Sequence, residues 1–168
     1  MAIQLNEVEE TQALIKFYEL LENAFPATSC EVHPTESHEA YLNELQRLHF
    51  GGLDWRLTDL PDNENDSIGA AFDLLDDAAK TYYIAAYMRE SIIDSYYQTG
   101  CLSQLKSFAR QPDGLLRNLD PYQRESVVWY CDMVEDQLNE LSFMARLEHM
   151  PNILMAKHVR SVIRNTVW

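Results

Sequence analysis

The side chains best suited to chemistry include Tyr83, Tyr87 and Arg89, which lie close together in the chain. A spacing of four places Tyr83 and Tyr87 on one face of a helix, and Arg89 follows in the next turn. With a nearby carboxylate, these groups would line a polar pocket of the kind an uncharacterised enzyme would need. Tyrosines at this spacing also form protein-contact surfaces. Core packing, with the hydroxyl groups at the rim, is the simpler interpretation.

An acidic segment upstream loosely imitates a calcium-binding loop. Asp62, Glu64, Asp66 and Asp73 stand at positions 1, 3, 5 and 12 of such a loop. Ser67 replaces the glycine that makes the sharp turn, and Asp73 replaces the bidentate glutamate. The pattern therefore favours a solvated acidic loop over a calcium site.

A cysteine and two histidines form a second candidate metal site. Cys30, His33 and His38 are close in sequence, but their spacing matches no closed zinc pattern and no fourth ligand is evident. His149 and His158 do not have the spacing of a helical metal-binding pair. We therefore expect neither a metal nor a cofactor.

Nucleophilic catalysis has little support in the sequence. The chain contains no Gly-x-Ser-x-Gly motif and no glycine-rich phosphate loop. Cys101 follows Gly100 at an expected helix start, where the pKa of a thiol can be lowered. A lone cysteine is more often a packing residue, so the sequence favours a binding protein over an enzyme.

The net charge of −14 comes entirely from the first part of the chain. Residues 1–94 contain 19 acidic and 5 basic side chains, whereas residues 95–168 contain 8 of each. This charge would repel nucleic acid and anionic membranes, so we expect neither as a partner. It would attract a basic protein. The acidic side chains that we expect to meet such a protein are Glu36, Glu39, Glu44, Asp54, Asp59, Asp62, Glu64 and Asp66.

A basic stripe, formed by Lys157, Arg160 and Arg164, is expected on the last helix. These residues share one helix face because they are separated by three and four positions. The simpler interpretation is that the basic stripe folds back on the acidic residues 1–94. A separate partner site is the alternative.

The scaffold that must position these groups is predicted to be all-α. We expect a single-domain bundle of about six to eight helices around a central helix at residues 77–97, which is apolar nearly all round. Gly100 is expected to end it. We expect a helical domain over residues 1–145 and a basic C-terminal helix over residues 146–168, docked on that domain.

Local signals place two further helices. Asn6 is expected to cap a first helix that Pro26 stops. Asp120, Pro121 and Gln123 form a well-developed helix start, with an N-cap, a proline at the first position and a capping-box glutamine. The heptad-like apolar stripe from Val127 to Ala145 on this helix could also pair with a second copy of the chain.

Segments on both sides of the central helix resemble a known family. The segment LLDDAAKTYYIAAYMRESIIDS (residues 74–95) resembles the hallmark of the bacterial domain of unknown function 6714 family. Trp55 in LDWRLTDL and the segment LDPYQRESVVWYCDMVED (residues 119–136) fall where that family has similar features. The resemblance covers roughly residues 35–140.

The chain also departs from this family pattern. Ala85 stands where the family usually has proline, Leu75 stands where it has phenylalanine, and residues 145–168 lie outside the pattern. The pattern is a fold signature without established catalytic residues. The resemblance therefore implies a fold and no reaction.

The expected function follows from the charge and from the lack of catalytic motifs. We expect a cytoplasmic protein, since there is no signal peptide and no apolar run of about 18 residues. The best interpretation is a non-catalytic protein-binding module, such as a bacterial immunity or antitoxin-like protein that binds a basic toxin or effector. The alternatives are an enzyme with a tyrosine- and arginine-lined pocket and a structural or regulatory homodimer.

Overall fold

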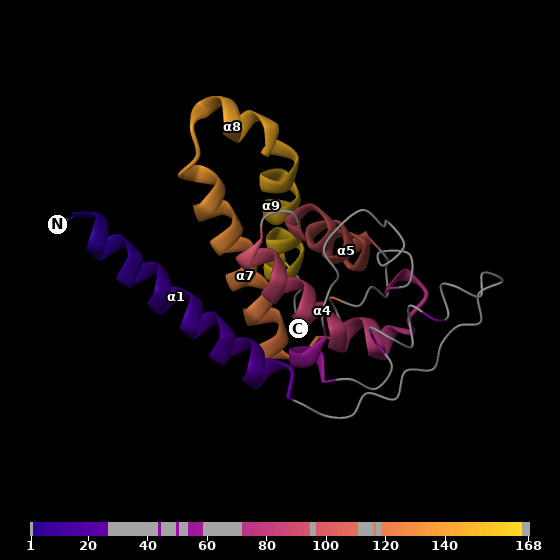
Figure 1. Ribbon diagram of the computed structural model, residues 1–168. Coiled ribbons are helices and arrows are strands. Elements are labelled where there is room, and N and C mark those ends of the chain that lie inside the picture. The colour runs from indigo at the N-terminus through magenta and orange to yellow at the C-terminus, as the bar shows by residue number, and fades with distance from the viewer. Residues whose placement is uncertain are drawn as a thin grey trace.

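The computed structural model describes residues 2–26, 44, 50, 54–58, 72–94, 97–110, 116 and 119–165. These residues form an all-α helical bundle in which no strand is found, as predicted. Figure 1 shows the helices α1 (Ala2–Ala24), α4 (Asp77–Ile93), α5 (Gln98–Arg110), α7 (Pro121–Asn139), α8 (Phe143–Glu148) and α9 (Met150–Asn165), with the short 3-10 helix η1 (Trp55–Leu57).

The bundle is built around contacts between sequence-distant helices. α7 packs against both α1 and α9, and α5 packs against both α4 and α9. α8 lies at one end of the bundle, where it connects α7 to α9 (Figure 1). The boundary expected between residues 145 and 146 falls inside α8, and the basic helix α9 packs on α7 and α5.

α4 is the apolar central helix that the sequence predicts. Asp76 caps it by accepting a hydrogen bond from the Ala79 N–H at 2.8 Å. Ten of its 17 residues are buried, and it contacts η1, α5 and α7. The predicted end at residue 97 is wrong, because α4 ends at Ile93 and Gly100 lies inside α5. The apolar sequence pattern continues past Ile93, but the C-cap residue Asp94 has an extended backbone conformation (φ −125°, ψ 112°).

α7 begins as the sequence predicts. The Asp120 carboxylate accepts from the Gln123 N–H at 2.9 Å, and the Gln123 side chain accepts from the Asp120 N–H at 3.1 Å. The helix ends at Asn139, so the predicted apolar stripe is interrupted before Ala145. Its members on α7 (Val127, Cys131, Val134 and Leu138) are buried within the chain, so they are not available to a second copy.

α1 is longer than the sequence predicts. It begins at Ala2, so Asn6 lies inside the helix instead of capping it. Its buried face comprises Phe17, Leu21, Ala24 and the following Phe25. The Trp55 indole N–H donates to the Phe25 carbonyl at 2.7 Å, which ties η1 to the end of α1.

Candidate protein-binding surfaces

The structure describes two of the eight acidic side chains expected to meet a partner. Glu44 is exposed, and Asp54 is partly buried. The other six lie outside the described residues: Glu36, Glu39, Asp59, Asp62, Glu64 and Asp66. Glu44 has the accessibility that a partner-binding residue needs.

Asp54 is already bound within the chain. Its carboxylate accepts from Arg56 Nη2 at 2.6 Å and from the Arg56 backbone N–H at 3.0 Å. The hydrogen bond to the Arg56 side chain holds the pKa of Asp54 below its ordinary value. Arg56 also lies 3.9 Å from Glu22 of α1. The charge of Asp54 is therefore compensated within the chain.

Arg89 anchors η1 to α4. Its guanidinium donates to the carbonyls of Arg56 and Thr58, the latter at 3.0 Å, and lies 5.9 Å from the centre of the Trp55 ring. Its Nε also donates to Glu90 at 2.7 Å. Arg89 thus holds the backbone of η1 against α4.

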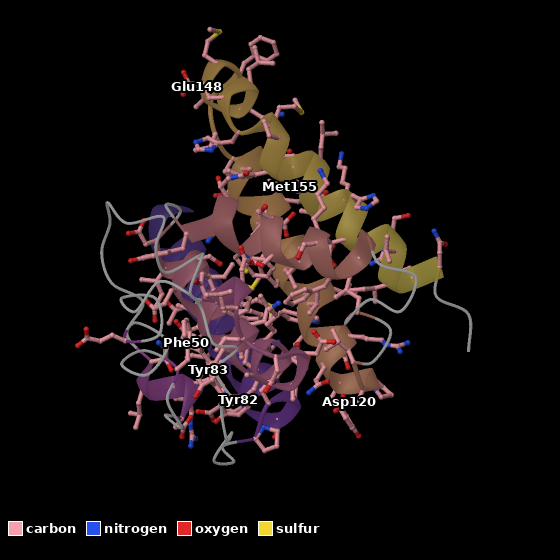
Figure 2. All side chains as sticks on the ribbon, turned by 90° about the vertical axis from the view of Figure 1, so that its right-hand side faces the viewer. Phe50, Tyr82, Tyr83, Asp120, Glu148 and Met155 are labelled. Atoms are coloured by element: carbon pink, nitrogen blue, oxygen red, sulfur yellow. The ribbon has the colours of Figure 1, made fainter. Side chains whose placement is uncertain are left out.

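Tyr83 and Tyr87 share a helix face, as their spacing predicts, but that face is in the core. Tyr83 is completely buried, and its hydroxyl donates to the Phe50 carbonyl at 2.5 Å. Its ring packs edge-on against Phe50, and Tyr87 packs in the same way against Phe72. Burial raises the pKa of Tyr87 above its ordinary value. Figure 2 shows Phe50, Tyr82 and Tyr83 grouped together at one end of the molecule. These tyrosines stabilise the core.

The cysteine thiols are also in the core. Cys101 lies in the first turn of α5 and is completely buried, which raises its pKa to about 12. Burial likewise raises the pKa of Cys131. The lowered pKa that the sequence allowed for Cys101 is therefore wrong, because the thiol faces the interior. Neither of these two thiols is an activated nucleophile at neutral pH.

Two of the three side chains of the basic stripe, Arg160 and Arg164, pair with acids of α7. Arg160 forms ion pairs with Asp132 and with Glu135, the latter at 2.8 Å, and Arg164 lies 3.9 Å from Asp132. The hydrogen bond to Asp132 raises the pKa of Arg160 further. Both acids belong to the electrically neutral residues 95–168. Among the described residues, neither arginine pairs with an acid of residues 1–94, so the expected fold-back is not seen there. Lys157 is exposed and forms no ion pair with a described residue.

Exposed apolar side chains, which the sequence analysis missed, occur on α8 and in the first turns of α9. Phe143, Met144 and Leu147 on α8 are 71%, 68% and 47% exposed, and Leu154 on α9 is 59% exposed. We refer to these four residues as the apolar tip. The sequence contains a signal that could have predicted this exposure. Phe143 and Met144 directly follow the cap residue Ser142, in a helix of six residues that has no buried face.

The candidate metal sites receive no support from the described part of the chain. No group of histidine, cysteine or carboxylate side chains suited to a metal occurs there. Of the calcium-like loop, only Asp73 is described, and it accepts a hydrogen bond from Gln104 at 2.9 Å. Cys30, His33 and His38 lie outside the described residues. Within the same coverage, no helix has the length and apolar character needed to span a membrane.

Comparison with protein-family models, with curated proteins and with solved structures gave no match.

Proposed function

We propose that this chain is a non-catalytic protein-binding module whose acidic part, residues 1–94, binds a basic protein. A bacterial immunity or antitoxin-like protein that captures a basic toxin fits this chemistry. The acidic surface of the proposal comprises the eight side chains named above, with Glu44 as its exposed described member.

One observation carries the proposal: the arginines of the basic stripe are paired with acids of α7. Arg160 and Arg164 pair with Asp132 and Glu135, and no ion pair joins them to a described acid of residues 1–94. Several acids of that part are exposed in the structure: Glu19, Glu22, Glu44, Asp73, Asp77 and Asp94. Exposed acids such as Glu19 and Asp77 would attract a basic protein at long range.

The residues proposed for an enzyme are engaged in other contacts. Tyr83 donates to a backbone carbonyl in the core, Arg89 holds η1, and the Cys101 thiol is fully buried. These placements give no support to a catalytic role, so we favour binding through charge.

The test is co-expression with the product of the adjacent gene, followed by purification and calorimetry. We expect a complex to form at low salt. The complex should weaken at about 0.5 M NaCl, because salt at that concentration screens the attraction between exposed charges beyond a few ångströms. If the neighbouring product is toxic, we expect co-expression to relieve its toxicity.

A matched pair of variants makes this test specific. The variant Glu36→Gln/Glu39→Gln/Glu44→Gln removes three charges from the acidic surface. The control Glu125→Gln/Asp136→Asn/Glu140→Gln removes three exposed charges from α7 and its C-cap. Weaker binding in the first variant alone supports the proposal. Equal losses, or no complex with the adjacent product, would overturn it.

A further inference from the structure

We propose that the apolar tip is a self-association surface that binds the apolar tip of a second copy of this chain. The tip lies on the α8–α9 hairpin, at the end of the molecule opposite Phe50 and Tyr83. Figure 2 shows this separation, with Glu148 at the far end from these residues.

The structure of α8 is the first argument. The helix has six residues, from Phe143 to Glu148, and none of them is buried. Short helices in water depend on packing of an apolar face for most of their stability. Here Phe143, Met144 and Leu147 face solvent, so α8 lacks that packing within its own chain. A second copy docked on this face would supply it.

The charge distribution favours a second copy as the occupant. A chain with a net charge of −14 repels its own copies in most orientations. The apolar tip lies within residues 95–168, whose acidic and basic side chains balance. Arg160 and Arg164 are compensated by α7, and Lys157 is then the one lysine or arginine side chain of α9 that has no ion pair with a described residue. Two copies can therefore approach tip to tip while their acidic parts remain at a distance.

Reciprocal charges at the rim of the tip fit a two-fold arrangement. Glu148 at the end of α8 and Lys157 on α9 are both exposed, and neither forms an ion pair with a described residue. In a two-fold symmetric dimer the same surface of both copies forms the interface. Glu148 of each copy can therefore face Lys157 of the other copy. An acidic or a basic foreign surface would match only one of these charges.

The size of the patch sets the expected affinity. Four partly exposed side chains offer roughly 400 Å², about half of what each chain contributes to a standard stable interface. We therefore expect a weak dimer, with a Kd on the order of 10–100 µM. Because the contact is apolar, the dimer should persist at about 0.5 M NaCl, a concentration at which binding of a basic protein should weaken.

The test is sedimentation velocity of the full chain from about 1 to about 300 µM. We expect a monomer–dimer equilibrium, and we expect the Kd to rise at least about tenfold in Phe143→Ser/Met144→Ser/Leu147→Ser. This variant should fold, because it alters only exposed side chains of α8. The control Leu57→Ser/Ile93→Ser removes two equally exposed apolar residues elsewhere (73% and 63%) and should leave the Kd unchanged.

Charge reversal tests the two-fold arrangement. We expect Glu148→Lys to raise the Kd severalfold and Glu148→Lys/Lys157→Glu to restore it. A chain that remains monomeric to about 300 µM would overturn the inference, as would a dimer that the serine variant leaves intact. These outcomes do not depend on the binding of a basic protein, which is measured separately.

Discussion

Removal of the Arg160 charge is expected to destabilise the fold. In Arg160→Met the aliphatic stem remains, but Asp132 and the nearly buried Glu135 lose their cation. Breaking a fully buried pair costs about 3–5 kcal/mol. The Arg160 side chain is 22% exposed, and solvent therefore compensates part of that loss. We expect a decrease of about 2–3 kcal/mol in the free energy of unfolding, or roughly 4–12 °C in Tm.

Urea unfolding followed by circular dichroism measures this loss. The control Lys157→Met removes a cation of the same stripe that forms no ion pair with a described residue, and it should change stability by less than about 0.5 kcal/mol. The double variant Glu135→Gln/Arg160→Met should recover part of the loss, because the buried charge is then gone. An Arg160→Met protein within about 0.5 kcal/mol of the original chain would refute the assigned pairing.

Three further predictions concern α5 and the core. Gly100→Ala should stabilise the protein by about 0.5–1 kcal/mol, because an added Cβ meets nothing within 4 Å and the residue lies inside α5; a lower Tm would contradict this. Tyr83→Phe should cost about 1–2 kcal/mol in urea unfolding, because the buried Phe50 carbonyl loses its donor; unchanged stability would argue against that bond. Burial raises the pKa of Cys101 from 9.0 to about 12, so its neutral form is favoured by folding. The contribution of the neutral thiol to the free energy of unfolding should be complete below pH 9.0 and should decline as the pH rises toward about 12. The variant Cys101→Ala should show a smaller decline over this range. Identical profiles of stability against pH for the two proteins would contradict the assignment.

Local signals in the sequence predict the helices well. Asp76 and Asp120 are recognisable as caps because a cap depends on the residue and on the next three positions. The burial of α4 follows from its nearly uniform apolar composition. Its end at Ile93 could not be predicted in this way, because the apolar pattern continues beyond it.

Contacts between helices were harder to predict. Arg160 and Asp132 are 28 residues apart, and their pairing depends on how α7 and α9 cross. The sequence does show that Asp132 and Glu135 share one face of α7 and that Arg160 and Arg164 share one face of α9, because each pair has helical spacing. Net charge alone predicted that the basic stripe would contact residues 1–94. Net charge does not show which acidic side chains lie close to the stripe in the fold. The apolar tip was missed for a related reason: the periodic stripe of α7 was extended through residue 145.

The association rate with the product of the adjacent gene tests the central claim most directly, namely that the acidic charge of residues 1–94 is free to attract a basic protein. At low salt, stopped-flow measurement should show a rate constant about tenfold lower for Glu36→Gln/Glu39→Gln/Glu44→Gln than for the original chain. The α7 control variant with three neutralised acids should stay within about twofold of the original chain. Equal rate constants for the two variants would contradict the account.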